Sequence, residues 1–189
     1  MVQPKYHKYI TLFLLFTVIF SPFKIYAQHL MFSSTPYEMQ NDSNSNTLRV
    51  MTYNIRVDNP EDGEHAWVNR KELVASVIRF HKADIVGVQE ALAHQIEDLM
   101  ALLPDYAWVG MGRNNDGGGE FSAILYRSSI VSVKAAQTFW LSKSPDVPGS
   151  QSWDSSLPRI ATWAHFDTKY DEQEIFVLNT HFDLSLIHI

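Results

Sequence analysis

Apolar and polar positions follow two different patterns along the first part of the chain. Residues 48–55 and 83–89 are short apolar runs rich in β-branched side chains, which predicts buried strands. In residues 67–81 and 94–103 the apolar side chains recur at the spacing of one helix face, which predicts amphipathic helices. This part of the chain is therefore expected to fold as strand, helix, strand, helix.

The second part of the chain has the pattern of several strands separated by turns. The strand candidates are residues 106–110, 121–126, 130–139, 160–167 and 175–179. Residues 142–158 contain three prolines and are expected to form a surface loop. The whole order predicts an α/β (α+β) fold, with a mixed sheet that carries helices on one face. The other face of that sheet is apolar, and we expect its partner sheet to be missing from this chain.

The N-terminal segment has the pattern of an export signal. Lys5 and Lys8 precede a short apolar run at 10–20, and a small residue suited to cleavage follows it. The run is too short to span a bilayer, although an uncleaved membrane anchor is the alternative. We expect residues 1–27 to be a signal peptide, with a secreted or periplasmic protein and no stable membrane span after cleavage. Residues 28–47, rich in Ser, Asn and Thr, are expected to form a flexible lead-in.

Composition narrows the classes of function. The formal charge is −6, and the first 27 residues hold three Lys and no acidic residue, so the rest carries a net charge of about −9. This charge argues against a protein that holds nucleic acid through a broad basic surface. It leaves room for a local phosphate site that recruits a cation. The chain contains no cysteine, so packing rather than disulfides must hold the domain together.

Glu90 is the strongest single candidate for chemistry. It follows the apolar strand at 83–89 and precedes a helix, and α/β sheets bind ligands at the carboxyl ends of their strands. A carboxylate at this place suits Mg²⁺, which keeps several waters and takes one or two protein carboxylates. The alternative is an acidic residue that the macrodipole of the following helix favours.

Asn54, His181 and Asp183 also stand at or just beyond the ends of apolar strands. The amide of Asn54 can bind a phosphate oxygen or a metal-bound water, and turn capping is its alternative role. The imidazole of His181 can serve as a general acid or base, and a purely structural histidine is the alternative. Because strand ends can converge at one edge of a sheet, the set of residues is a stronger signal than any member.

Glu120 and Arg159 complete the candidate set. Glu120 opens a strand after three glycines, where it would orient the imidazole if it reached His181; an exposed edge carboxylate is the alternative. Arg159 precedes the strand at 160–167, and its forked guanidinium suits a phosphate. The alternative for Arg159 is a surface arginine after a proline.

Four short motifs, in this order, resemble the endonuclease/exonuclease/phosphatase superfamily. They are Met-Thr-Tyr-Asn-Ile-Arg at 51–56, Val-Gln-Glu at 88–90, Gly-Glu-Phe-Ser-Ala-Ile-Leu-Tyr-Arg at 119–127 and Leu-Asn-Thr-His-Phe-Asp at 178–183. The superfamily includes pancreatic-type deoxyribonucleases, abasic-site endonucleases, neutral sphingomyelinases, inositol-polyphosphate 5-phosphatases and deadenylases. The region around Trp140, Trp153 and Pro158-Arg159 resembles a bacterial branch of metal-dependent hydrolases.

The resemblance implies a role for each candidate residue. Glu90 would bind Mg²⁺, with Mn²⁺ as the alternative, and Asn54 would position the metal-bound water and the phosphate. His181 would contact the scissile phosphate, with Glu120 as its hydrogen-bond partner. Two further residues would contact the substrate: Arg159 and Asp183.

The resemblance also implies a fold and the part of that fold that this chain contains. It covers residues 48–183 and makes them the N-terminal half of a four-layer α/β/β/α sandwich with a mixed, mostly antiparallel sheet. The family continues with a second half, which brings an Asp-x-Asn motif and a catalytic Asp-His pair. We therefore expect a truncated domain that is inactive or nearly so and poorly soluble. Residues 184–189 match no family pattern, and His188 among them is not expected to replace the catalytic histidine.

Two classes of function stay open at this point. The first is metal-dependent hydrolysis of a phosphoester by in-line attack of water, with the complete enzyme expected to be a monomer. Its substrate would be a nucleotide, a lipid headgroup, a sugar phosphate or nucleic acid. The second is an exported binding module without catalysis, in which the five tryptophans and the loop from Trp140 to Trp153 form a stacking surface, for example for a glycan.

Overall fold

The computed structural model of the chain describes residues 10–12, 47–170 and 173–183. Most of the segment predicted as a signal peptide lies outside these ranges, as do residues 28–46 of the predicted lead-in and the tail at 184–189. These assignments stay predictions. None of the helices in the described ranges is long and apolar enough to cross a membrane.

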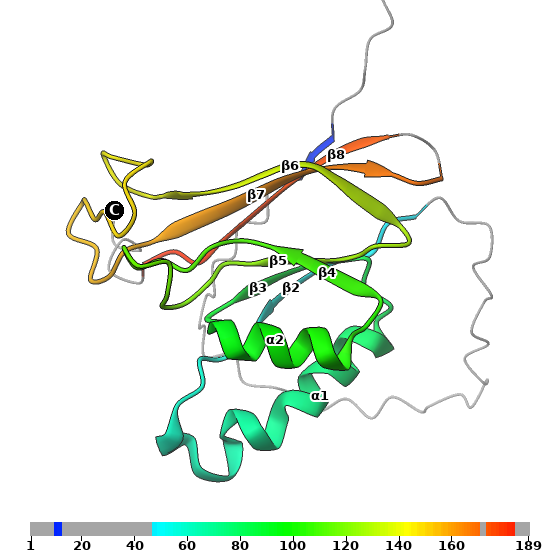
Figure 1. The fold of residues 1–189 in the computed structure, drawn as a ribbon, viewed down its shortest axis with the longest axis horizontal. Coiled ribbons are helices and arrows are strands. Elements are labelled where there is room, and N and C mark those ends of the chain that lie inside the picture. The colour runs from blue at the N-terminus through cyan, green and yellow to red at the C-terminus, as the bar shows by residue number, and fades with distance from the viewer. Residues whose placement is uncertain (1–9, 13–46, 171–172, 184–189) are drawn as a thin grey trace, which may run out of the picture.

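The first sheet has four strands and carries both α-helices on one face (Figure 1). In sheet order the strands are β2 (Val50–Asn54), β3 (Ile85–Gln89), β5 (Ile124–Arg127) and β4 (Tyr106–Val109). β2 and β3 run parallel, and the other neighbours run antiparallel. The helices are α1 (Trp67–Phe80) and α2 (Ala93–Leu102), and a short 3₁₀ helix, η1 (Pro60–His65), precedes α1. The predicted order of strand, helix, strand, helix is confirmed.

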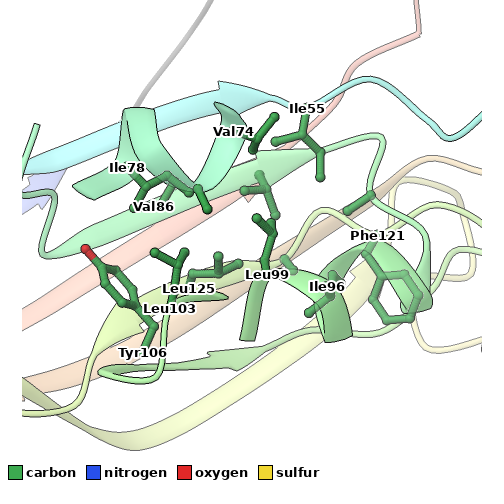
Figure 2. Close-up of a cluster of buried hydrophobic side chains, with 14 of the residues drawn as sticks. Ile55, Val74, Ile78, Val86, Ile96, Leu99, Leu103, Tyr106, Phe121 and Leu125 are labelled. Atoms are coloured by element: carbon green, nitrogen blue, oxygen red, sulfur yellow. The ribbon is translucent and has the colours of Figure 1, made fainter. Parts of the chain in front are cut away.

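The helices pack on the first sheet through a continuous apolar core (Figure 2). Ile78 of α1 and Ile96 and Leu99 of α2 are fully buried. They share one cluster with Val86 of β3 and Leu125 of β5. Burying a side chain of this size contributes about 1.5–3 kcal/mol relative to leaving it in water. The core therefore fixes the central strands of the first sheet against the two helices.

The remaining strands form a second sheet that lies on the opposite face of the first (Figure 1). β6 (Val131–Trp140), β7 (Ile160–Thr168) and β8 (Glu174–Thr180) are antiparallel neighbours. β1 (Ile10–Leu12), from the segment predicted as a signal peptide, pairs in parallel with β8 at the edge. Helices, first sheet and second sheet make three stacked layers. In the described ranges no helix lies on the outer face of the second sheet, so the fourth layer stays a prediction.

The second sheet corrects the expectation that this chain lacks a partner sheet. A buried cluster between the two sheets includes Ile85, Ile124, Val131, Phe166 and Val177. β3 is buried along its whole length because helices cover one of its faces and the second sheet covers the other. An apolar pattern shows that a strand is buried but not which sheet it joins, which is why the pattern alone predicts a single sheet.

Gly87→Ala tests this stacking of the sheets. A Cβ atom at Gly87 would lie 2.9 Å from Cγ of Asn179 in the second sheet, which is closer than real Cβ atoms approach their neighbours. We expect the substitution to lower the free energy of unfolding by about 1–3 kcal/mol, measured by urea denaturation. Adding Asn179→Ala removes the obstructing atoms, so the double variant should lose less than the sum of the two single variants. A Gly87→Ala protein as stable as the wild type would contradict this packing.

Candidate active site

Three of the predicted site residues meet where strands of both sheets end. β2 and β3 run parallel with Asn54 paired to Gln89, so both strands end at the same edge. Asn54 Nδ2 donates a 2.7 Å hydrogen bond to Oε1 of Glu90, which directly follows β3. His181 directly follows β8, and its Nε2 lies 3.3 Å from the same Oε1. The expected convergence of these strand ends is therefore present in the structure.

Glu90 and the loop after β2 adopt a backbone conformation that is rare for residues with a side chain. Glu90 has φ of 62° and Arg56 has φ of 60°, and such left-handed residues cost about 1–3 kcal/mol each. The N–H of Arg56 donates to Oδ1 of Asn54 at 2.9 Å. The N–H of Val57 donates to Oε2 of Glu90 at 3.2 Å. The loop thus folds back over the carboxylate and supplies it with a backbone donor.

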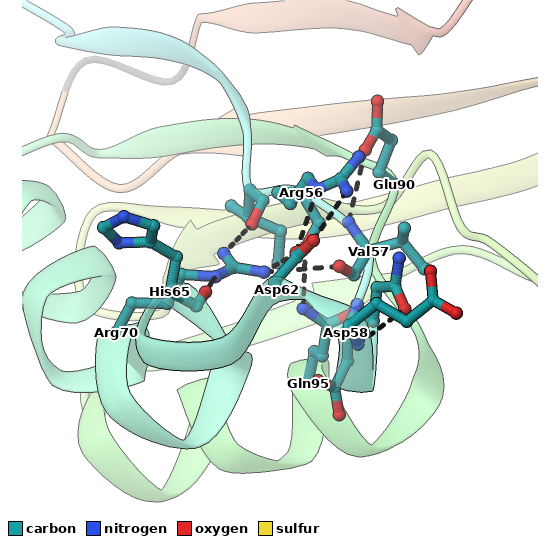
Figure 3. Close-up of polar contacts among 11 residues, drawn as sticks. Arg56, Val57, Asp58, Asp62, His65, Arg70, Glu90 and Gln95 are labelled. Carbon is teal, nitrogen blue, oxygen red and sulfur yellow. Dashed lines mark hydrogen bonds and ion pairs between the residues drawn. The ribbon is translucent and has the colours of Figure 1, made fainter.

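Two side chains from the helices hold this loop in place (Figure 3). Arg70 of α1 donates to the backbone oxygens of His65 at 2.9 Å and Arg56 at 2.7 Å. Gln95 of α2 is fully buried, donates to the backbone oxygen of Arg56 at 2.9 Å and accepts from the N–H of Asp58 at 3.0 Å. Neither residue is among the sequence candidates. A glutamine at a core-facing position of an amphipathic helix is the signal that points to such a role.

Glu90 is held in its charged form. Hydrogen bonding from His181, then from Asn54 and the N–H of Val57, lowers the pKa of Glu90 to about 2 although the carboxyl is partly buried. A carboxylate that stays ionised beside a pocket suits a hard divalent cation such as Mg²⁺. Oδ1 of Asn54 accepts from Arg56, so this amide orients Glu90 through its Nδ2 group. The donor set fits a cation held by one carboxylate and by water.

A small pocket opens beside Glu90 and His181. Its lining also includes Arg113 and Glu120 from one glycine-rich turn and Arg159, which directly precedes β7. Four of the predicted site residues therefore line one pocket, together with Arg113, which the sequence analysis does not single out. The pocket combines two guanidinium groups with the carboxylate that suits a cation, which is a surrounding suited to a phosphoryl group.

The structure corrects the predicted partner of Glu120. Arg113 binds its carboxylate through two bonds, Nη1 to Oε2 at 3.0 Å and Nη2 to Oε1 at 2.9 Å, whereas His181 contacts Glu90. A guanidinium and a carboxylate joined by two bonds form a stronger contact than a single hydrogen bond. The backbone N–H of Arg113 also donates to the backbone oxygen of Glu120 at 3.1 Å, and this bond closes the turn between the two residues. A catalytic role for Glu120 and for His181 stays a prediction.

Asp183 lies behind Arg159 in the wall of the pocket. Its side chain is 2 % exposed, and Oδ2 accepts from Nε of Arg159 at 3.2 Å. The same oxygen accepts from the N–H and the hydroxyl of Ser156, both at 2.9 Å. Asp183 therefore fixes Arg159 and the end of the loop at 142–158. Asp183 is thus buried and bound to neighbouring residues, and its predicted contact with a substrate stays a prediction.

A second group of possible metal ligands lies on the outer face of the second sheet. His165, Asp167 and Glu174 bring their ligand atoms within 4.8 Å of one another. The ammonium of Lys134 already supplies positive charge there, at 2.5 Å from Glu174 and 3.4 Å from Asp167. This lysine pairs with both carboxylates of the cluster, which lies on the opposite side of the sheet from the site at Glu90.

Comparison with known proteins shows a consistent set of relatives. Residues 51–175 match the Endonuclease/Exonuclease/phosphatase family. A crystal structure of an endonuclease/exonuclease/phosphatase family protein from Bacteroides thetaiotaomicron is 40% identical, covers 72% of this chain and 51% of that chain, and has a TM-score of 0.70. A mannosyl-6-phosphatase from the same organism is 39% identical, covers 72% of this chain and 52% of that chain, and has a TM-score of 0.70.

A more distant relative comes from a virus. An uncharacterised protein of Acanthamoeba polyphaga mimivirus is 27% identical over 135 residues, which are 65% of this chain and 48% of that protein. The chain thus spans about half the length of the relatives it matches. The family match extends over more than half of the chain, and on this evidence the chain belongs to the endonuclease/exonuclease/phosphatase family.

Proposed function

We propose that the longest form of this protein that its gene encodes hydrolyses phosphoesters with the help of a divalent cation bound at Glu90, Mg²⁺ in the first place and Mn²⁺ as the alternative. The observation that carries the proposal is the carboxylate of Glu90, held ionised between Asn54 and His181 at the mouth of a pocket with two arginines. Family membership supports phosphoester hydrolysis, and the 39% identical relative named as a mannosyl-6-phosphatase supports it further.

Five residues in or beside the pocket have a part in this mechanism. Glu90 holds the cation, which when bound supplies positive charge that offsets the phosphoryl oxygens. Asn54 keeps the carboxylate in place through its 2.7 Å bond. Arg159 donates to a phosphoryl oxygen, and Asp183 keeps its guanidinium directed along the pocket wall. His181 contacts the phosphoryl group and donates or receives a proton there.

The substrate is proposed to be a small phosphoester. The net charge of the chain is negative, so long nucleic acid finds no broad basic surface to follow. A nucleotide, a lipid headgroup or a sugar phosphate brings one phosphoryl group to the pocket without requiring such a surface. The name of the bacterial relative places sugar phosphates first among the compounds to test.

The alternative of a non-catalytic binding module depends on exposed tryptophans. Trp140 is 3 % exposed and its Nε1 donates to the backbone oxygen of Arg113, so this ring is buried and helps to hold a residue of the pocket. Trp153 is 54 % exposed. Within the loop, a stacking surface would therefore depend on Trp153, and ligand binding there would depend neither on a cation nor on Glu90.

Mg²⁺ titration of purified protein by calorimetry tests the cation site. We expect Glu90→Gln to weaken Mg²⁺ binding by at least about tenfold, because the amide brings no charge to the cation. The matched control is Glu174→Gln, which removes a carboxylate from the outer cluster and should leave the affinity unchanged. Loss of Mg²⁺ binding in the Glu174 variant, with normal binding in the Glu90 variant, would refute the site.

A phosphoester panel on the longest form of the protein that its gene encodes tests the reaction. Mannose 6-phosphate, a nucleoside monophosphate, phosphocholine and a bis-aryl phosphodiester would be assayed with Mg²⁺ and with a chelator. We expect His181→Ala to lower turnover by about 10²–10⁴-fold on the best substrate, because a general acid or base contributes that much. Turnover that survives both the chelator and Glu90→Ala would contradict metal-dependent hydrolysis, and cation-independent glycan binding through Trp153 would favour the binding module.

A further inference from the structure

Two buried amide side chains that bind each other lie next to the residues of the pocket along β3 and β8. Gln89 directly precedes Glu90, and Asn179 stands two residues before His181. The two amides are 8 % and 6 % exposed, and Nε2 of Gln89 donates to Oδ1 of Asn179 at 2.6 Å. The bond joins β3 of the first sheet to β8 of the second, next along the strands to the contact between Glu90 and His181.

Asn179 also binds the backbone of the first sheet. Its Nδ2 donates to the carbonyl oxygens of Val88 and Ala123, both at 2.8 Å. Packed sheets normally meet through apolar side chains about 10 Å apart, so an amide that reaches backbone oxygens across the gap needs local space. Gly87 provides that space, since a Cβ atom there would lie 2.9 Å from the Asn179 side chain.

Gln89 extends the network to the remaining strand of the site. Its Nε2 lies 3.2 Å from the hydroxyl of Thr52, two residues before Asn54 on β2, and 3.1 Å from the oxygen of Gly87. The network therefore touches β2, β3, β8 and the segment that precedes β5, which carry or adjoin Asn54, Glu90, His181 and Glu120.

Stability alone gives little reason for this pair. A buried amide that loses its partner costs about 1–3 kcal/mol, but replacing both partners with apolar groups of the same shape is often nearly neutral. A hydrogen-bonded pair differs from an apolar one in that it fixes both direction and distance. Residues behind a metal ligand act in this way, and their loss typically weakens metal binding by about 10–100-fold.

We propose that Gln89 and Asn179 are positioning residues of the site. They hold the end of β3 against the end of β8, so that Glu90 and His181 keep the 3.3 Å contact that prepares the pocket for a cation and a phosphoryl group. The part of this role that concerns the cation rests on the proposed function. The part that concerns the geometry of the two side chains does not.

The test replaces both amides by apolar side chains of similar shape. Gln89→Met/Asn179→Leu removes both amides, whereas Asn179→Leu alone leaves the buried amide of Gln89 without this partner. The midpoint of urea denaturation of the double variant should therefore exceed that of Asn179→Leu. We nevertheless expect the Mg²⁺ dissociation constant, measured by calorimetry on folded protein, to rise about 10–100-fold. We also expect the ring signals of His181 in the NMR spectrum of the metal-free protein to shift from their wild-type positions.

The matched control is Thr162→Val. Thr162 pairs with Asn179 across β7 and β8, is fully buried, and exchanges a 2.8 Å hydrogen bond with the hydroxyl of Thr138. The substitution removes a buried hydrogen bond that lies beside Asn179 and stays within the second sheet. We therefore expect wild-type His181 signals and Mg²⁺ affinity. Equal changes in this control and in the double variant would overturn the proposal, because they would reflect general loosening.

Further outcomes separate the two proposals. Wild-type protein that does not bind Mg²⁺ would refute the proposed function, while the His181 signals of the metal-free protein would still decide the positioning role. His181 signals and Mg²⁺ affinity unchanged in the double variant would overturn the positioning role alone. If the double variant does not fold, Gln89→Met, which leaves both backbone bonds of Asn179 in place, is judged by the same two measurements.

Discussion

The stacking of the two sheets is the constraint on which the site depends. Glu90 belongs to the first sheet and His181 to the second, so their 3.3 Å contact exists only because the sheets pack face to face. Apolar side chains supply most of the driving force for this packing, whereas the amides of Gln89 and Asn179 give it direction at the functional end. The same packing thus builds the core and sets the distance between two chemical groups.

The site also depends on the negative charge of Glu90. One carboxylate receives bonds from an amide, a backbone N–H and an imidazole, and these bonds outweigh its partial burial. The arginines beside it are each tied to a carboxylate of their own, Arg113 to Glu120 and Arg159 to Asp183. Charges in the pocket are therefore held in fixed places before any ligand arrives, which lowers the reorganisation needed when charge develops.

Much of the fold could be predicted from the sequence because its elements depend on local patterns. The apolar spacing predicts both α-helices and the strands, and the polar residues at strand ends predict the gathering of Asn54, Glu90 and His181. The assignment of strands to two sheets depends on long-range packing, which no local pattern encodes. The partner of Glu120 depends on Arg113, which stands across a glycine-rich turn whose course the sequence does not define. Gln89 and Asn179 look like ordinary polar residues of a strand until the sheets are stacked.

The carboxylate of Glu90 is the proposed cation site of this protein. Crystals soaked in MnCl₂ test this proposal most directly, because manganese has a strong anomalous signal and its preference for oxygen ligands resembles that of Mg²⁺. We expect an anomalous peak within coordination distance of Glu90, beside His181 and open to the pocket. A peak confined to His165, Asp167 and Glu174, or no peak at Glu90 at saturating Mn²⁺, would contradict the proposal.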